Sequence, residues 1–407
     1  MPEFSPEDHP RARSGEPPRR HGVRAILVAL TACLALVSLG ACGDDDADSS
    51  SAGGSGGGEA SAEVAEARKA VRALEAPVEF VAPGPAIEVG DSLRGDTIYV
   101  VANGLNFPFV QAMLGALKQG ADAVGAKVVA VDGAGDTTKA AQLVERGVGR
   151  NVDAIVIQSF PAEQLTAALR SAKAASIPVV ELTGRDPQAP PASLREVGVE
   201  AIASFCYTCA GQQMAQFAVA DTDGDVNAVL FDVPEIGVSK LERQGFTSEL
   251  KELCPDCQVK VVDAPLAQWN KDLPSLTTSV LQRDPNVNYL VPLYDSMIAL
   301  MEPAVARAQA TDVKVVSYNA TEPALTMLED GQLVAGDVGG MNAWLGWAAM
   351  DQIARLATDN EPAADVEIPH RIFTADNIDS IDLSAPETEW YGDLDLAAEY
   401  TKLWGVE

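Results

Sequence analysis

The chain has 407 residues, a length that allows two or three domains of ordinary size. It carries 59 Asp and Glu against 29 Lys and Arg, which gives a formal charge of −30, and 47% of its residues are hydrophobic. This composition is that of a globular protein, and it argues against binding of nucleic acid or anionic lipid, because both need Lys and Arg to neutralise phosphate.

The first forty residues are predicted to be an export signal. Five arginines lie between residues 11 and 24, and an almost wholly apolar stretch follows from 25 to 39. Such a stretch is short for a membrane span but has the length of a signal-peptide core. The pattern leaves the choice between Sec and twin-arginine export open.

Leu39-Gly40-Ala41-Cys42 ends this segment and resembles a bacterial lipobox. The resemblance implies cleavage before Cys42 and lipidation of its thiol; a plain signal peptide or a single-span anchor, with Cys42 incidental, is the alternative. The Ser/Gly-rich run that follows favours a flexible tether. We therefore expect a signal peptide over 1–41, a tether over 42–60, and a folded part anchored by lipid to the outer face of the bacterial cytoplasmic membrane.

From residue 97, short apolar runs alternate with amphipathic segments, which is the pattern of a parallel sheet covered by helices. A first series has strands at 97–102, 127–131, 152–158 and 178–182. The pattern breaks near 198–204, and a second series follows with strands at 227–231, 259–262, 289–291, 313–317 and 332–338. These two series predict an α/β protein with two doubly wound lobes of parallel sheet, and a (β/α)₈ barrel is the alternative. Residues 61–94 are expected to form an added helix at 61–74, on the first lobe or in the tether, and a connector.

Polar and aromatic side chains recur just past the predicted strands, where ligands collect in parallel α/β sheets. Amides and carboxylates bond in fixed planes, Arg can fork onto neighbouring oxygens, and ring faces accept the C–H side of a sugar, so the mixture suits a polyhydroxylated ligand. Any one of these residues could instead cap a helix or shape a turn. The candidates are Asn103, Asn106, Phe107, Phe109, Gln158, Ser159, Arg185, Asp186, Glu235, Ser239, Trp269, Tyr294, Asp295 and Asn319.

Roughly residues 96–383 resemble the type I periplasmic sugar-binding family. The segments that carry the resemblance are Asn106-Phe107-Pro108-Phe109, Tyr294-Asp295-Ser296-Met297 and Val316-Ser317-Tyr318-Asn319-Ala320-Thr321. The resemblance implies two lobes joined by a three-crossing hinge, which close on a sugar-like ligand and present it to the permease of an ABC importer. It places the first lobe at 95–203 plus 340–372 and the second at 204–339 plus 373–407, with crossings near 198–204, 337–341 and 372–375. We expect a monomer without cofactor.

The same resemblance assigns roles to the candidates and shows departures. Asn106, Phe107 and Phe109 are implied to contact ligand from the first lobe, Trp269 to stack, and Asp295 and Asn319 to bind hydroxyls. Where the family usually has an Asn-Asp pair the chain has Tyr294-Asp295, and a common Asp is replaced by Asn319. The Arg that the family has after the first strand of the second lobe has no clear counterpart, and Ser239, Lys240 and Arg243 are its candidates. A Gln that is frequent in the family corresponds to a position near Gly340, which has no side chain. These departures argue against a simple pentose as ligand.

Four cysteines form two CxxC pairs, Cys206 with Cys209 and Cys254 with Cys257. Zinc ribbons usually place such pairs closer together, and an oxidising compartment favours disulfides. We expect two disulfides, within or across the pairs, and no metal.

Little in the sequence supports catalysis. His9 and His21 leave with the signal, so a histidine mechanism could use only His370, and no nucleophile or phosphate-binding motif is present. The sequence predicts a binding protein, not an enzyme. A sensor subunit signalling to a membrane receptor is the second hypothesis. A carbohydrate-active enzyme, with Glu235 and Asp295 as its carboxylate pair, is the third.

Overall fold

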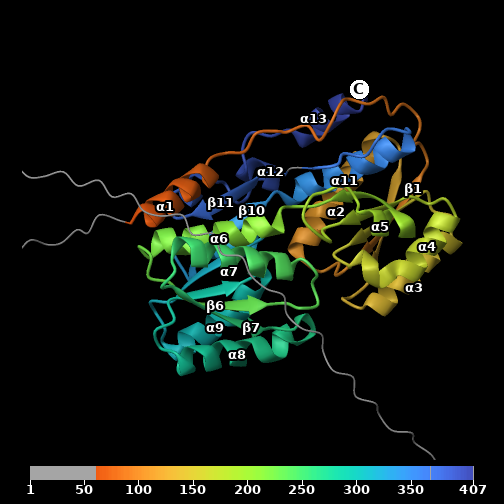
Figure 1. Ribbon diagram of the computed structural model, residues 1–407. Coiled ribbons are helices and arrows are strands. Elements are labelled where there is room, and N and C mark those ends of the chain that lie inside the picture. The colour runs from red at the N-terminus through yellow and green to blue at the C-terminus, as the bar shows by residue number, and fades with distance from the viewer. Residues whose placement is uncertain (1–60, 367, 407) are drawn as a thin grey trace, which may run out of the picture. The chain divides into compact units, whose positions relative to one another are not determined.

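The computed structural model describes residues 61–366 and 368–406, whose helices are built around two separate sheets (Figure 1). The first sheet is parallel throughout, in the order β2-β1-β3-β4-β5. Its strands are β1 Thr97–Ala102, β2 Lys127–Asp132, β3 Ala154–Gln158, β4 Val179–Leu182 and β5 Val199–Ala203.

The second sheet has the order β11-β10-β9-β8-β6-β7 and is parallel except for β11, which pairs antiparallel with β10. Its strands are β6 Asn227–Asp232, β7 Gln258–Asp263, β8 Tyr289–Pro292, β9 Lys314–Tyr318, β10 Val334–Gly340 and β11 His370–Thr374. The prediction of two doubly wound lobes is confirmed, and a single closed barrel is excluded.

Alternation along β1 shows why helices cover both faces of the first sheet. Ile98 and Val100 belong to the hydrophobic cluster that includes α2 and α11, whereas Tyr99 and Val101 belong to a second cluster with α3 and α4. Successive side chains of a strand point to opposite faces, so a strand that is apolar at every position must be covered twice. The first-lobe helices are α2 Pro108–Ala123, α3 Thr137–Gly149, η1 Ala162–Leu165, α4 Thr166–Ala174, α5 Ala192–Val197 and α11 Asn342–Ala357.

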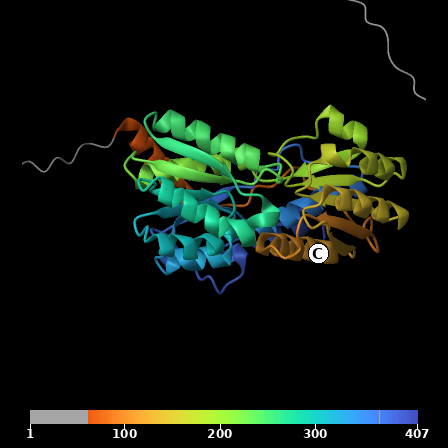
Figure 2. The same cartoon turned by 90° about the horizontal axis from the view of Figure 1, so that it is seen from below.

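The second lobe repeats this arrangement, with α6 and α7 on one face of its sheet and α8 and α9 on the other (Figures 1 and 2). A glycine permits the close approach of α6 and α7, because a Cβ on Gly211 would collide with the backbone of Glu242 and Phe246. The helices are α6 Tyr207–Asp221, α7 Ser239–Leu253, η2 Leu266–Gln268, α8 Trp269–Arg283, η3 Asp295–Met297, α9 Ile298–Ala308 and α10 Glu322–Glu329.

The chain crosses between the lobes from β5 to α6, from β10 to α11, and from α11 to β11. The third crossing ends before His370, because β11 pairs with β10 in the second sheet. The expected crossing at 372–375, and the assignment of 370–372 to the first lobe, are therefore wrong. β11 is short and fully buried, so its sequence pattern does not indicate which of the two sheets it joins.

The two ends of the described chain form further links, which we call the terminal straps, residues 75–94 and 375–406. Helix α1 (Ala62–Leu74) packs on α6 of the second lobe, and so takes neither of the two expected places, on the first lobe or in the tether. The first strap then leads to β1. The second strap contains η4 Ile378–Ser380, α12 Glu387–Trp390 and α13 Leu396–Leu403. Although 373–407 was expected in the second lobe, α13 packs against α2 and α11 of the first. The straps also bind each other, since Val78 N–H donates to Tyr391 O (2.7 Å) and Ile87 N–H to Leu403 O (2.8 Å).

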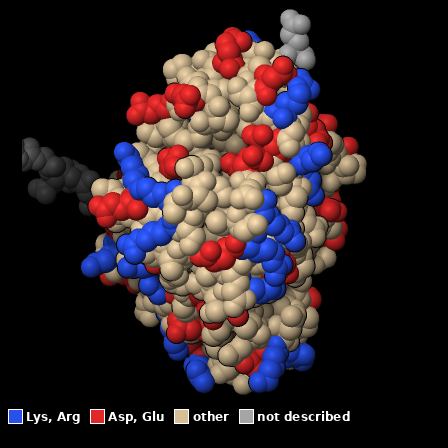
Figure 3. All heavy atoms as spheres, turned by 90° about the vertical axis from the view of Figure 1, so that its right-hand side faces the viewer, with Lys and Arg blue, Asp and Glu red and all other residues tan. Residues whose placement is uncertain are grey.

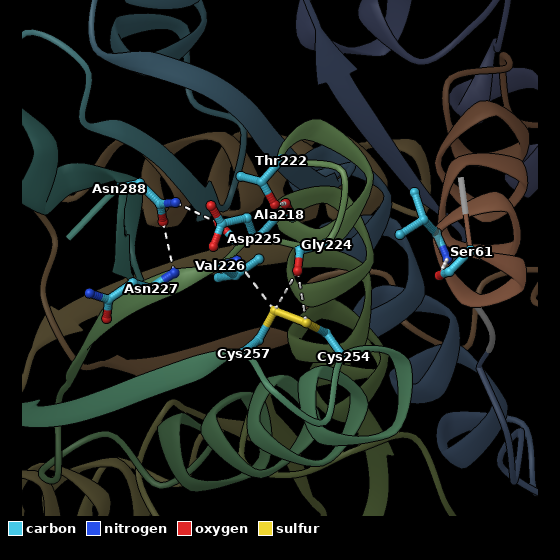
Figure 4. Close-up of a disulfide and its surroundings, with 11 residues drawn as sticks. Ser61, Ala218, Thr222, Gly224, Asp225, Val226, Asn227, Cys254, Cys257 and Asn288 are labelled. Carbon is cyan, nitrogen blue, oxygen red and sulfur yellow. Dashed lines mark hydrogen bonds between the residues drawn. A yellow bond between two sulfur atoms is a disulfide. The ribbon is translucent and has the colours of Figure 1, made fainter. Parts of the chain in front are cut away.

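Both disulfides form within their CxxC pairs, so the cross-paired and zinc alternatives are excluded. The first, Cys206–Cys209, lies where the chain crosses from β5 to α6, and we call it the hinge disulfide. The second disulfide, Cys254–Cys257, follows α7 (Figure 4). There Val226 N–H donates to Cys257 Sγ (3.2 Å) and Asn288 Nδ2 donates to Asp225 O (2.6 Å), which fixes the loop that leads into β6.

The predicted signal peptide, tether and lipidation at Cys42 lie outside the described residues. No helix of the described part combines the length and apolar composition that a membrane crossing needs. On the face in Figure 3, positive and negative side chains are interspersed rather than gathered into a patch of one sign.

Candidate ligand-binding cleft

Two adjoining cavities lie at the carboxyl ends of the strands, and residues of both lobes line each of them. The larger has a volume of about 550 Å³ and the smaller about 40 Å³. Both are bounded by Asn103 and Phe107 from the first lobe and by Leu266, Trp269 and Ser296 from the second. We refer to the two cavities together as the cleft.

Nine of the fourteen candidate residues line the cleft, which places them together although they come from separate loops. Asn106 and Asp295 line the larger cavity. Those that line the smaller cavity are Asn103, Phe107, Phe109, Ser159, Trp269, Tyr294 and Asn319. Their contact with a ligand remains a prediction.

Phe107 and Trp269 meet across the cleft and join the two lobes through aromatic contact. Their ring centroids are 6.3 Å apart with the planes at 65°, an edge-to-face arrangement. Phe107 also stacks on Phe109 at 6.3 Å, and Trp269 lies 6.4 Å from Tyr294. The indole N–H of Trp269 donates to Ala264 O (2.9 Å), which fixes the plane of the ring.

A hydrogen-bonded floor supports the first-lobe wall. Asn103 N–H donates to Gln158 Oε1 (3.0 Å), and Asn103 Nδ2 donates to Ser159 O (2.9 Å). Ser159 and Thr183 both have positive φ, +55° and +57°, and their hydroxyls lie 2.7 Å apart. Left-handed backbone is costly for such residues and persists where surrounding bonds hold it, which is common at ligand sites. Gln158 therefore supports the wall from beneath and does not line the cleft.

Four other candidates also lie outside the cleft wall. Arg185 Nε donates to Glu181 (2.5 Å) and its Nη2 to Glu163 (3.0 Å), so the guanidinium is already occupied by carboxylates of its own lobe. Those carboxylates raise the pKa of Arg185 further above its usual value. Asp186 accepts from the hydroxyl of Thr208 (2.6 Å), a bond between the lobes next to the hinge disulfide.

The remaining two of these four stand behind second-lobe residues of the wall. Glu235 accepts a long bond from Leu266 N–H (3.4 Å), and the hydroxyls of Ser239 and Tyr294 lie 2.7 Å apart. Glu235 lies just past β6, as expected, and Ser239 begins α7. Only packing decides which of these side chains reach the cavity.

Asp295 is buried at the base of the larger cavity and is bound by the chain itself. Its Oδ2 accepts from Thr321 N–H (2.7 Å) and from Thr321 Oγ1 (2.6 Å). Burial is the main cause that raises the pKa of Asp295 to about 6, against these bonds that lower it. Its Oδ1 accepts a long bond from the hydroxyl of Ser296 (3.4 Å), so Asp295 holds the end of β8 to the start of α10.

The family model described as "Periplasmic binding protein domain" matches residues 98–361, from β1 to just beyond α11. The chain belongs to this family. As a periplasmic binding protein it acts outside the cytoplasm and binds a solute; members of the family are not enzymes. Among the residues that the structure describes, no three His, Cys, Asp or Glu are placed to hold a metal ion.

Curated relatives of this periplasmic binding protein are distant. The D-apiose import binding protein of Actinobacillus succinogenes is 24% identical over 262 residues, which cover 61% of this chain and 78% of the relative. The ribose import binding protein of Bacillus subtilis is 25% identical, covering 59% of this chain and 74% of the relative.

Solved structures show the same fold. A solute-binding protein of an ABC transporter from Agrobacterium vitis, with bound allitol, has a TM-score of 0.62 at 19% identity and covers 71% of this chain and 98% of its own. One from Bacillus halodurans, with bound myo-inositol, has a TM-score of 0.60 at 18% identity and covers 71% and 97%.

The cleft of this periplasmic binding protein also contains residues that sequence reasoning did not select. Tyr207, inside the first CxxC pair, lines the smaller cavity with Ile236 and Val238, and Asp132 and Thr321 line the larger. Asp132 comes directly after the strand predicted at 127–131 and could have been found by the same rule as Asn103. Tyr207 could not, because its place depends on how the chain crosses between the lobes.

Proposed function

We propose that this protein is the solute-binding component of an ABC importer and that it binds a sugar or polyol between its lobes. The observation that carries the proposal is the cleft, where Phe107 of one lobe and Trp269 of the other form opposite walls. Relatives named for ribose and D-apiose import, and fold neighbours with allitol or myo-inositol bound, support this ligand class.

The binding mechanism follows from walls that belong to two lobes. A ligand that contacts both lobes stabilises the arrangement in which they are close, and it shifts the population toward that closed state. Closure removes water from the polar contacts at Asn103 and Asn319, which strengthens them. The closed surface, made of both lobes, is then what a permease recognises.

The test is isothermal titration calorimetry of the full chain against sugars and polyols, followed by Trp269→Ala. Loss of the indole wall should raise Kd by at least about tenfold, which corresponds to about 1.4 kcal/mol. Lys271→Ala is the matched control, because Lys271 lies on the same helix with its side chain 85% exposed. A folded Trp269→Ala variant that binds as tightly as the parent protein would refute the assignment of the cleft.

We also propose that Cys42 carries a lipid that holds the protein, as a monomer, at the outer face of the cytoplasmic membrane. The lipobox-like Leu39-Gly40-Ala41-Cys42 and the Ser/Gly-rich run after it support this proposal. Labelled palmitate should be incorporated into the full chain in cells and not into Cys42→Ser. Equal labelling of both chains would refute it.

A further inference from the structure

The cleft contains carboxylates but no basic side chain among the described residues that line it. Asp132 and Asp295 line the larger cavity, and no Lys, Arg or His lines either one. Arg185, the expected cation of the first lobe, is bound by two glutamates. Arg243, a candidate of the second lobe, is bound by Asp232. A carboxylate or phosphate on a ligand would lose its hydration here without gaining a positively charged partner among the residues that line the cavities.

A further carboxylate lies behind the aromatic wall of the smaller cavity. Glu242 follows Ser239 by one turn on the buried face of α7, and Ser239 in turn bonds the hydroxyl of Tyr294. Glu242 is fully buried, and the hydroxyl of Tyr294 lies close enough to its carboxylate to lower its pKa. Burial raises the pKa of Glu242 well above its usual value, so a positive charge brought close to it would favour the ionised form.

The cleft itself also has a free hydrogen-bond acceptor, the side-chain oxygen of Asn103. Asn103 donates through Nδ2 to Ser159 O, while its Oδ1 is buried and has no partner in the described residues. A buried acceptor without a partner is costly, and a ligand donor can satisfy it. An ammonium group has three donors and no acceptor, so it could satisfy this oxygen.

Five aromatic rings surround the smaller cavity, those of Phe107, Phe109, Tyr207, Trp269 and Tyr294. Ring faces attract cations, more strongly where water is excluded, and several rings together form the cages that bind substituted ammonium groups. The smaller cavity therefore combines aromatic walls, a free acceptor and a nearby buried carboxylate.

We propose that the cleft selects an amino sugar in its cationic form, with the ammonium in the smaller cavity and the hydroxyls in the larger, and that it rejects sugar acids and sugar phosphates. This selectivity rests on the proposed function, because it concerns the same cleft. It assigns Glu242 a role as a positioning residue that favours the cation without touching the sugar ring.

The test compares ligands that share one ring and differ in charge. Glucosamine, galactosamine and mannosamine are titrated calorimetrically against their neutral parents and against glucuronate and glucose 6-phosphate, at neutral pH, where most of the amine is charged and Asp295 is ionised. At least one amino sugar should bind about tenfold or more tightly than its parent sugar, and the two anions should give no binding. A neutral parent that binds as tightly as its amine, or a binding anion, would overturn the selectivity and leave the proposed function standing. Absence of binding across amines and parents alike would overturn both.

Glu242→Gln separates charge from shape. The substitution should lower the ratio of the affinity for the amino sugar to the affinity for its neutral parent toward one. Glu252→Gln is the control, since it makes the same change on an exposed position of the same helix. Retention of the full amine preference by a folded Glu242→Gln variant would exclude the role of this carboxylate. The comparison of ligands on the parent protein decides the selectivity even where the variant does not fold.

Discussion

His370 is expected to make the folded protein sensitive to acid in a defined window. Its imidazole is buried next to Phe205 and Tyr318, and Nδ1–H donates to Gln213 Oε1 (2.7 Å). Burial lowers the pKa of His370 to about 4, whereas an imidazole in the unfolded chain titrates near its ordinary value of about 6.5. Between these two values the unfolded chain takes up a proton that the folded chain does not, so the free energy of unfolding decreases as pH falls.

The size of the effect follows from the difference of the two pKa values. One unit corresponds to about 1.4 kcal/mol, so this histidine should remove about 2 kcal/mol of stability at about pH 5 and about 3 kcal/mol at about pH 4. Buried carboxylates such as Asp295 and Asp337, whose pKa values are raised, change stability with pH in the opposite direction. The histidine contribution must therefore be measured as a difference between two proteins.

The appropriate variant is His370→Asn, whose side-chain amide can still donate to Gln213. Urea unfolding of the parent and the variant at a series of pH values should show a constant offset above pH 7, from lost packing. Below that, the gap should change steadily in the variant's favour by about 3 kcal/mol as pH falls to about 4. Gln213→Glu is the counter-test, because a carboxylate beside the imidazole raises its pKa and should reduce the acid sensitivity. Parallel curves for the parent and His370→Asn through this window would refute the reasoning.

Three further predictions concern packing, a buried acid and the two disulfides. Gly211→Ala should lower the free energy of unfolding by about 1–3 kcal/mol through collision of α6 with α7, whereas Gly115→Ala, where an added Cβ meets nothing within 4 Å, should be neutral or stabilising in a melting experiment. Asp337→Asn should become more stable than the parent as pH rises, because burial raises the pKa of Asp337 well above its ordinary value and the parent loses stability when this carboxyl ionises. Replacing both cysteines of either disulfide by serine should cost about 2 kcal/mol in chemical unfolding. Only loss of the hinge disulfide should also weaken ligand binding in calorimetry, and equal binding by the two variants would contradict a role at the hinge.

The main strands were predictable because each is an apolar run bounded by turn residues. The run at 154–158, for instance, is apolar on both faces up to Gln158, as a central parallel strand must be. The residues just past those strands were predictable for the same reason, and Asn103, Phe107 and Asn319 line the cleft. What the sequence could not decide was the choice among neighbours: Arg185 stands at a strand end like Asn103 but binds Glu181, a partner inside its own lobe.

The ends of the chain were less predictable for a different physical reason. Helix α1 is amphipathic, but its pattern shows only that one face is buried, not which lobe buries it. The same holds for α13, whose Tyr400 stacks on Trp347 of α11 at 5.8 Å. The place where a terminal helix packs depends on the shape of a surface distant in the sequence, and no local sequence motif predicts it.

The terminal straps link the two lobes outside residues 98–361, the segment that matches the family. Opening of the cleft must bend five chain segments, and two of these are bonded to each other outside residues 98–361. In the proposed mechanism, the two straps therefore move together with the lobes when ligand binds. A fluorophore attached next to Val406 would report ligand binding from a position remote from the ligand, and a chain trimmed to the shared segment would lose that coupling together with the cover over Trp347.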